Sequence, residues 1–230
     1  MKKIFWCKNC LNMSTRPRIS FDERGWCNAC VWMEEKKNLD WSKREQELIK
    51  LFSKYKSKNN EFDCVVPVSG GKDGSYIAHT LKHKYKMNPL AINVTPPLPL
   101  KLGEENLKNF AASGYNLIQL HPNQEVMRFL DKRGFIDKGF PYFGWLVAIQ
   151  SAVIRTALNF NLSLIFYGED GEVEYGGSTE TSGNPIYDVN YYRNNIPDYT
   201  FLFAWNHKDE IFKKEKNILK KTKWFAHINF

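Results

Sequence analysis

The residues of this chain best placed to do chemistry form the heptapeptide SGGKDGS at 69–75. It follows an apolar run at 62–68 and precedes a helix-like stretch that begins at Tyr76. A glycine turn between a strand and a helix leaves backbone N–H groups aimed at an anion, and adjacent glycines let a phosphate approach the main chain. The serine hydroxyls add donors, and Lys72 adds a positive charge. The heptapeptide therefore predicts a phosphate-binding loop, with a turn that binds no ligand as the alternative.

Asp73 distinguishes this loop from a plain phosphate cradle. A carboxylate at this place can hold Mg²⁺, which in turn holds phosphate oxygens. The loop is not a Walker A loop, because Val66 stands where that motif has its first glycine and Asp73 follows the lysine in place of Ser or Thr. It resembles the pyrophosphate-binding loop (PP-loop) of the ATP pyrophosphatase superfamily, whose usual form is S-G-G-x-D-S. Gly74 replaces the last serine of that form, and Ser75 offers a hydroxyl one residue later.

Four cysteines form a second pattern with a recognisable chemistry. Cys7 and Cys10 make one C-x-x-C pair, Cys27 and Cys30 make another, and 16 residues separate the two pairs. This spacing lies in the window of four-cysteine zinc sites. Each pair forms a tight knuckle that aims two thiolates at one tetrahedral ion, and four thiolates fill its coordination sphere. We therefore predict a closed, structural Zn²⁺ site.

Two alternatives stay open for these four cysteines. Disulfides are one, although a cytoplasmic chain of this size rarely uses them. A redox C-x-x-C is the other, although two pairs at this spacing more naturally share a metal. The fifth cysteine, Cys64, lies in the predicted strand before the glycine loop. We interpret it as a small buried hydrophobic residue.

The composition is that of a globular protein, with 43% hydrophobic and 15% aromatic residues in a chain of 230. No apolar run approaches the roughly 20 residues that span a bilayer, and the N-terminus lacks the apolar stretch of a signal peptide. We therefore expect a cytoplasmic protein with no membrane partner. The net charge of +8 invites a nucleic-acid partner. Basic and acidic residues are mixed along the chain, however, which favours a solvated surface over a nucleic-acid interface.

Strand-like and helix-like segments alternate beyond residue 60. Strands are expected at 62–68, 90–94, 116–120 and 162–167, and helices at 75–85, 103–112, 124–132 and 143–160. Such alternation implies right-handed βαβ crossovers and a parallel sheet. The predicted fold class is therefore α/β, with a parallel-sheet PP-loop domain and a small N-terminal four-cysteine module.

The chain is expected to divide into a zinc knuckle module at 1–33, a connector helix at 34–60 and the PP-loop domain at 61–230. In the connector, Ser42 and Glu45 have the spacing of a capping box. Apolar residues then recur at helical spacing and predict one face that packs on the main domain. They are Trp41, Leu48, Leu51, Phe52 and Tyr55.

Ligands of parallel α/β sheets bind at the carboxyl ends of the strands. The glycine loop, Thr95, His121 and the segment 168–170 all follow predicted strands, so we expect them to converge on one cleft. A carboxylate such as Glu169 at this edge can bind a metal, orient a substrate or act as a general base. An acidic surface loop is the alternative for the acidic residues that follow it, which are Glu172, Glu174 and Glu180.

Longer stretches of the chain resemble the N-acetyl sugar amidotransferase family, the PP-loop enzymes of bacterial surface polysaccharide and flagellar nonulosonate pathways. The resemblance rests on the four-cysteine module, SGGKDGSY at 69–76, GEENLKNFAASGYNLIQLHPN at 103–123 and FYGEDGEVEYGG at 166–177. It implies ATP-dependent conversion of an acetamido group, on a nucleotide-linked or otherwise activated sugar, into an acetamidino group. Members of this family are generally longer at the C-terminus, so part of the substrate site is expected to be absent or altered here.

The resemblance also implies roles for single residues. Lys72, Asp73 and Glu169 are expected to be catalytic, and Asp73 to bind Mg²⁺ as well. ATP is expected to contact the glycine loop and the strand ends that flank adenosine. These residues are Val68, Ser69, Gly70, Gly71, Lys72, Asp73, Gly74, Ser75, Asn93, Thr95 and Gly168. The sequence has no glutaminase nucleophile arrangement, so we expect ammonia from a separate glutaminase subunit, with a cyclase-like companion subunit.

Two other functions stay open. A tRNA-thiolating PP-loop enzyme would share the zinc module and use the positive charge. Such enzymes commonly use cysteines after the loop, and this chain has no cysteine beyond Cys64. A non-catalytic zinc-ribbon scaffold with a degenerate nucleotide site would bind ATP weakly or not at all and release no pyrophosphate.

Overall fold

The computed structural model describes residues 3–16, 18–59, 61–168, 199–202 and 223–226. The chain divides into two compact units, one from Trp32 to Gly171 and one formed by Met1–Val31 together with Glu172–Phe230. Among the described residues, no helix combines the length and the apolar character that crossing a membrane requires.

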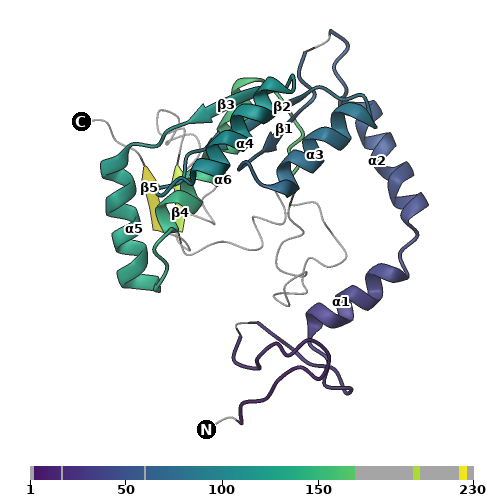
Figure 1. Ribbon diagram of the computed structural model, residues 1–230, viewed down its shortest axis with the longest axis vertical. Helices are drawn as coiled ribbons and strands as arrows, with labels where there is room; N and C mark the ends of the chain where they lie inside the picture. Colours follow the sequence, from purple (N-terminus) through teal and green to yellow (C-terminus); the bar gives the residue numbers. More distant parts are fainter. Residues whose placement is uncertain (1–2, 17, 60, 169–198, 203–222, 227–230) are drawn as a thin grey trace. The chain divides into compact units, whose positions relative to one another are not determined.

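A three-stranded parallel sheet lies at the centre of the unit at 32–171 (Figure 1). In spatial order its strands are β1 (Cys64–Pro67), β2 (Pro89–Val94) and β3 (Asn116–Leu120). Every residue of β2 is buried, as expected for a central strand that is covered on both faces. The strands predicted at 90–94 and 116–120 are confirmed, and β1 lies within the strand predicted at 62–68.

Helices pack against both faces of this sheet. One face is covered by α3 (Lys72–His83), α4 (Lys101–Ala112) and part of α2 (Trp41–Tyr55), and the other by α6 (Phe143–Asn159). Side chains alternate between the faces along β1: Cys64 and Val66 pack with the first group of helices, and Val65 packs with α6. The predicted α/β class with a parallel sheet is therefore confirmed.

The fourth predicted strand, at 162–167, is wrong as a strand, because this segment makes only one parallel bridge, between Ile165 and Val65. The Val65 N–H donates to Leu164, and Phe166 donates back to the Val65 carbonyl. The next donor on this side of β1 would be residue 67. Because Pro67 has no N–H, the ladder stops there. The segment nevertheless lies on the far side of β1 from β2, so β1 has a neighbour on each side.

The predicted connector at 34–60 holds α2 and only the last turn of α1 (Asn28–Lys37), which begins inside the predicted zinc module. The predicted capping box is wrong: the N-cap of α2 is Asp40, whose side chain accepts from the Lys43 N–H at 3.0 Å. Ser42 therefore lies inside the helix, because a carboxylate two residues earlier satisfies the free N–H. The predicted apolar face is confirmed at Leu48 and Phe52, which pack on the core. Trp41 does not belong to it, since 58% of its surface is exposed.

Two helices differ by three or more residues from a predicted bound. α3 begins at Lys72, so the second half of the predicted glycine loop is the first turn of a helix. α5 (Gln124–Lys138) continues six residues beyond the predicted end at 132 and stops at Gly139, which has a left-handed conformation. Outside the sheet, β4 (Tyr199–Leu202) and β5 (Lys223–Ala226) form a separate parallel pair.

A buried carboxylate, Asp63, ties the start of β1 to its surroundings. Its two oxygens accept from the backbone N–H groups of Ser57 at 2.5 Å and Asn88 at 2.6 Å. Its own N–H donates to the Asn88 carbonyl at 2.9 Å. Only 4% of Asp63 is exposed. This one side chain therefore joins the segment after α2, the start of β1 and the turn before β2.

Replacing Asp63 tests that anchor. We expect Asp63→Ala to lower the free energy of unfolding by about 3 kcal/mol, because two buried N–H groups lose a charged acceptor. Denaturant unfolding measures this value. The matched control is Asp137→Ala on α5, which removes an exposed ion pair with Arg133 and should cost under about 1 kcal/mol. Equal losses in the two variants would contradict the anchoring role.

Candidate functional site

The glycine loop follows the carboxyl end of β1 and contains a turn with a left-handed backbone conformation, which only glycine adopts readily. The Val68 N–H still pairs with the Ile92 carbonyl at 2.8 Å, and the chain then turns at Gly70, where φ is +81°. Gly71 is the N-cap of α3 and makes no side-chain cap. The first N–H groups of a helix have no acceptor within the helix. The start of α3 therefore offers donors and a positive dipole end to an anion.

Three stretches of backbone approach the loop more closely than a Cβ atom would allow. A Cβ at Gly70 would lie 2.5 Å from the Gly103 carbonyl oxygen of α4, and one at Gly74 would lie 2.4 Å from the Pro67 oxygen of β1. A Cβ at Gly168 would lie 2.8 Å from the backbone of Asp73. The structure therefore brings together the loop and Gly168, two predicted parts of the site that are about a hundred residues apart in the sequence.

Two asparagine side chains hold the carbonyls of this turn. Asn93 of β2 donates from Nδ2 to the Val68 oxygen at 2.8 Å, and Asn106 of α4 donates from Nδ2 to the Gly70 oxygen at 2.9 Å. Only 4% of Asn93 is exposed, and its Oδ1 is buried without a hydrogen-bond partner among the described residues. Burying an acceptor without a hydrogen-bond partner costs folding free energy and is unusual in proteins. A ligand or water that donates to this oxygen would remove that cost.

The charged residues of the loop contact each other. Lys72 Nζ lies 2.6 Å from the Asp73 carboxylate, and their side chains are 89% and 48% exposed. The hydroxyl of Ser75 donates to the Gly71 carbonyl at 2.8 Å, and the Ser69 hydroxyl accepts from the Gly71 N–H at 3.3 Å. A polyanion at the start of α3 would therefore meet an ammonium group, a carboxylate able to bind a cation, and hydroxyls already oriented by the backbone.

Thr95 follows β2 at the same edge of the sheet. Its N–H donates to the Leu120 carbonyl at 2.9 Å, and its hydroxyl lies 3.1 Å from Nδ1 of His121. The structure thus pairs two of the residues predicted at strand ends. The predicted catalytic residue Glu169 lies outside the described residues, as do the acidic residues after it.

Asn106 was not predicted. It stands inside an amphipathic helix, where no motif marks it, and it reaches the loop only because α4 packs directly against Gly70. It belongs to the GEENLKNF stretch at 103–110, which is part of the resemblance to N-acetyl sugar amidotransferases. That stretch was the one sequence signal that could have suggested a role for this residue.

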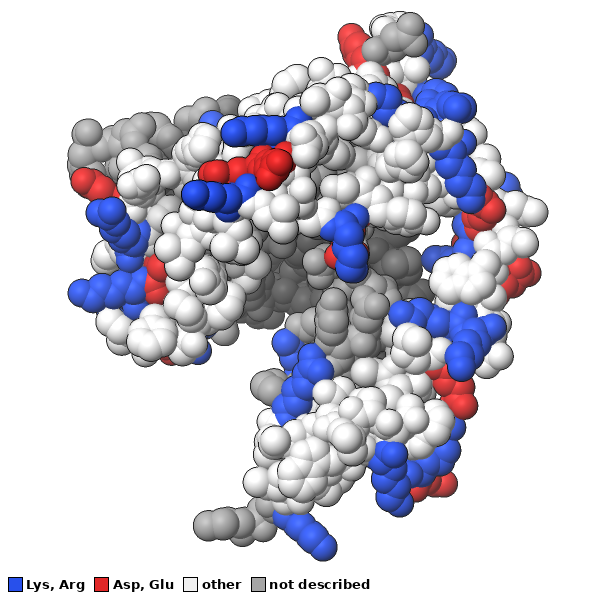
Figure 2. All heavy atoms as spheres, in the orientation of Figure 1, with Lys and Arg blue, Asp and Glu red and all other residues white. Residues whose placement is uncertain are grey.

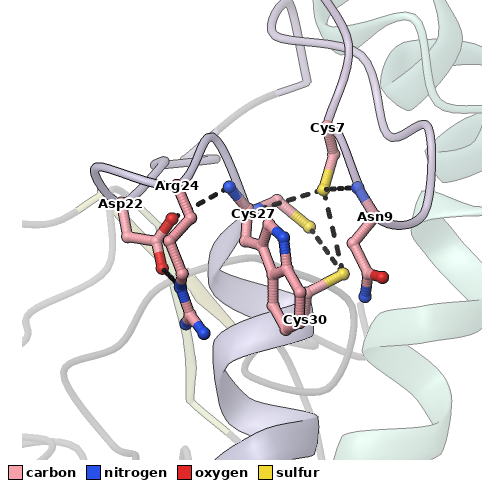
Figure 3. A network of polar contacts seen from close by, with 7 residues as sticks. Cys7, Asn9, Asp22, Arg24, Cys27 and Cys30 are labelled. Atoms are coloured by element: carbon pink, nitrogen blue, oxygen red, sulfur yellow. Dashed lines mark hydrogen bonds and ion pairs between the residues drawn. The ribbon is translucent and has the colours of Figure 1, made fainter.

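The four predicted zinc ligands form a compact cluster in the N-terminal module, in which all four sulfurs lie within 4.8 Å of one another. Figure 3 shows three of them, Cys7, Cys27 and Cys30. The measured separations are 3.5 Å for Cys10–Cys27, 3.7 Å for Cys27–Cys30 and 3.8 Å for Cys7–Cys30. Four sulfurs at about 2.3 Å from one Zn²⁺ would be about 3.8 Å apart in a tetrahedron. The cluster therefore fits a tetrahedral zinc ion, and all four cysteines are free thiols, not disulfides.

Backbone N–H groups surround Cys7 and favour its thiolate. Its sulfur accepts from the N–H groups of Cys27 at 3.1 Å and Asn9 at 3.4 Å. Burial opposes ionisation, but the N–H groups of Cys10, Cys27 and Asn9 outweigh it and lower the Cys7 pKa to about 6. Burial instead raises the pKa of Cys30 to about 12. Burial also raises the pKa of Cys10, so a bound cation would have to compensate for the ionisation of both Cys10 and Cys30.

The second knuckle is held by a short polar turn beside the cluster. Asp22 accepts from the Trp26 N–H at 2.9 Å and from Arg24 Nε at 2.7 Å (Figure 3). Gly25, at a φ of +78°, accepts from the Lys8 N–H at 3.0 Å, which links this turn to the first knuckle. The two C-x-x-C pairs are thus held together by main-chain bonds as well as by the expected ion.

Cys64 has none of these features. It is fully buried in the core between the sheet, α2, α3 and α4. Burial, and after it the nearby charge of Asp63, raise the pKa of its thiol to about 12. The interpretation as a small buried hydrophobic residue is confirmed, and Cys64 is poorly suited to act as a nucleophile.

The visible face of the molecule carries interspersed charges. In Figure 2, basic side chains are scattered over the face that the view shows, with fewer acidic side chains among them. Ion pairs such as Lys84 with Glu45 at 2.6 Å account for part of this pattern. The solvated surface stays a prediction from the mixed charges of the sequence.

One protein family and one archaeal protein are similar to parts of this chain. Residues 147–228 match a family described as the C-methyltransferase C-terminal domain, a match that contains neither the glycine loop nor the four cysteines. A stretch of 104 residues is 29% identical to an uncharacterized protein of Methanocaldococcus jannaschii. That stretch is 45% of this chain and 37% of the relative, so the match spans less than half the length of either protein.

Metal analysis tests the cysteine cluster. We expect about one Zn²⁺ per chain, with occupancy falling as the pH is lowered, because protons compete with zinc for the thiolates. Cys10→Ala removes one ligand and should release most of the zinc to a chelator that leaves the wild type loaded. The control Cys64→Ala should keep one zinc. No zinc in protein purified without chelator, or two disulfides by mass spectrometry, would contradict the site.

A pair of glycine substitutions tests the close approach at the loop. Gly70 and Gly139 both have a left-handed backbone, but only Gly70 faces another backbone at 2.5 Å, whereas Gly139 has open space within 4 Å. We expect Gly139→Ala to cost about 1 kcal/mol of unfolding free energy, from its conformation alone. Gly70→Ala should cost at least about 2 kcal/mol more, because the new Cβ must push α4 away. Equal costs in thermal or denaturant unfolding would show that α4 does not press on the loop.

Proposed function

We propose that this chain binds ATP at the glycine loop and adenylates an amide oxygen, with release of pyrophosphate. The observation that carries the proposal is the backbone at the end of β1. There a strand, a left-handed glycine and a helix start follow one another, and Gly168 closes against Asp73 from the other side of β1. From β1 the chain adds β2 and β3 on one side of β1, and the segment at Ile165 then lies on the opposite side of β1. The order of the strands therefore reverses at β1, and α/β sheets bind ligands at such a switch point.

Each part of the loop suits a leaving pyrophosphate. The N–H groups at the start of α3 and the Lys72 ammonium group would stabilise negative charge that develops as pyrophosphate departs. Asp73 would hold Mg²⁺, which supplies positive charge beside the phosphates. To do so, Asp73 has to exchange its contact with Lys72 for the metal and thereby free the lysine for phosphate. Its half-exposed carboxylate fits this role.

The sugar substrate rests on the resemblance to N-acetyl sugar amidotransferases. In the proposed reaction the acetamido oxygen attacks the α-phosphorus of ATP, and the bond from that phosphorus to pyrophosphate breaks. Ammonia then adds to the activated carbon, and AMP leaves with the oxygen. The products are an acetamidino sugar, AMP and pyrophosphate. Glu169 would face the acceptor, and a separate glutaminase subunit with a cyclase-like companion would supply the ammonia.

The structure bears on one rival. Sulfur transfer to tRNA would need a reactive cysteine near the loop. The chain has five cysteines: four belong to the metal cluster, and the fifth, Cys64, is buried with a pKa of about 12. None of them is therefore suited to carry sulfur in the folded, metal-loaded protein.

Carbon methylation is a second candidate function. It is favoured by one observation, the match of residues 147–228 to the C-methyltransferase C-terminal domain. A methyltransferase needs a methyl donor such as S-adenosylmethionine, and it releases no pyrophosphate from ATP. The two functions therefore differ in cosubstrate as well as in product.

The deciding experiment offers both cosubstrates to the zinc-loaded chain. One set of reactions contains ATP, Mg²⁺, ammonium and a panel of UDP-linked N-acetyl sugars, and pyrophosphate and product mass are followed. The other set contains S-adenosylmethionine and the same sugars. Pyrophosphate release with a product 1 Da lighter, the change when NH replaces O, supports amidotransfer. A product 14 Da heavier supports methylation. Neither product, together with no ATP binding, would favour a scaffold.

Asp73→Asn tests the proposed mechanism. It keeps the size and removes the charge, so we expect adenylation to slow by about 100-fold or more, the scale for one preorganised electrostatic contact. Because Asp73 is half exposed, the unfolding free energy should hardly change. Asp137→Asn on α5 makes the same charge change away from the loop and should leave the rate unaltered. Near-normal turnover by a folded Asp73→Asn protein would remove the loop from the mechanism.

A further inference from the structure

We infer that Asn106 is a positioning residue that sets the direction of the N–H groups in the glycine loop. The residue belongs to α4, 36 positions after Gly70, and donates from Nδ2 to the Gly70 carbonyl at 2.9 Å. The pyrophosphate-binding part of this inference rests on the proposed function. The effect on the loop backbone does not.

One face of α4 both packs against the glycine loop and donates a hydrogen bond to it. Gly103 and Asn106 are three residues apart, so they lie on one side of the helix. Gly103 brings the helix backbone against Gly70, where a Cβ would lie 2.5 Å from the Gly103 oxygen. Asn106 then bonds the carbonyl of that same glycine. Steric contact fixes the position of the turn, and the hydrogen bond fixes its orientation.

Peptide planarity transmits this orientation to the anion-binding donors. In a trans peptide the C=O and the following N–H point in opposite directions. With its carbonyl bonded to Asn106, Gly70 must turn the Gly71 N–H away from α4. That N–H points toward the Ser69 hydroxyl, to which it donates at 3.3 Å until an anion replaces that acceptor. Asn93 acts in the same way from the other side, because its bond to the Val68 carbonyl sets the direction of the Ser69 N–H. The two amides therefore bracket the turn and orient its donors before any ligand arrives.

The chemistry of the amide is specific for this task. Asn106 must donate to a carbonyl, and the side chain that matches its shape without a donor is an ionised aspartate. Asn106→Asp would place a negative charge next to the carbonyl and near any bound anion. Asn106→Ala would remove the donor without adding charge. Both variants leave the contact between Gly103 and Gly70 intact, so they separate orientation from packing.

Hydrogen exchange of the zinc-loaded full chain tests the inference without any nucleotide. We expect amides at 69–75 to exchange roughly 2- to 12-fold faster in both Asn106 variants, the factor that corresponds to one hydrogen bond. Exchange in β2 and the melting temperature should stay close to wild type. The controls are Asn109→Asp and Asn109→Ala, one turn along α4, where the side chain is exposed. They should leave the exchange of the loop unchanged.

A second measurement connects the loop to its ligand. Calorimetry with Mg²⁺ and inorganic pyrophosphate should give weaker binding in both Asn106 variants, with the larger loss in Asn106→Asp, and no change in the Asn109 controls. Unchanged exchange at 69–75 in Asn106→Ala would overturn the inference, as would equal effects of the Asn106 and Asn109 variants. If wild type binds no pyrophosphate while the exchange result holds, the proposed function fails and the positioning role stands.

Discussion

Three stretches of backbone meet at the carboxyl end of β1, and they come so close that glycine stands at each point of contact. α4 presses on Gly70, the end of β1 on Gly74, and the segment beyond Ile165 brings Gly168 against Asp73. Such close contact is possible only if the helices lie directly on the sheet, as the two core clusters allow. The position of α3, and with it the direction of its free N–H groups, therefore depends on the absence of three side chains.

The N-terminal module is held together by different means. Its described part is short and has a small apolar cluster, in which the buried members are Cys7, Cys27, Ala29 and Cys30. Among the described residues, this cluster is the only hydrophobic one that Cys7, Cys27 and Cys30 belong to, and it is small. The sulfur separations of 3.5–3.8 Å indicate what replaces a larger core, because they match the edges of a tetrahedron around one ion. Folding of this module and metal binding are thus expected to be one process.

Much of this architecture could be predicted because it follows from local patterns. Alternating apolar segments located the sheet and its helices, and cysteine spacing located the metal cluster. The errors arose where one polar or cyclic side chain overrides the pattern. Pro67 ends the ladder beside Ile165 because it lacks an N–H, and Asp40 caps α2 in place of Ser42 because its carboxylate reaches the Lys43 N–H. Asn106 and Asp63 were missed for another reason: their partners are distant in the sequence, so no local spacing reports them.

The predicted ligation of four cysteines and the burial of the fifth have a practical consequence. Cys10 is exposed and would be protected from a thiol reagent only by the metal, whereas Cys64 is fully buried with a pKa of about 12, so labelling of the zinc-loaded protein should be slow until some part of it opens. Opening of the module would expose four sulfurs together, whereas Cys64 would be modified only when the sheet separates from its helices. The number of labels added over time would then report the opening of each unit separately. The chain thus carries two built-in probes of its own stability, with no added dye or engineered residue.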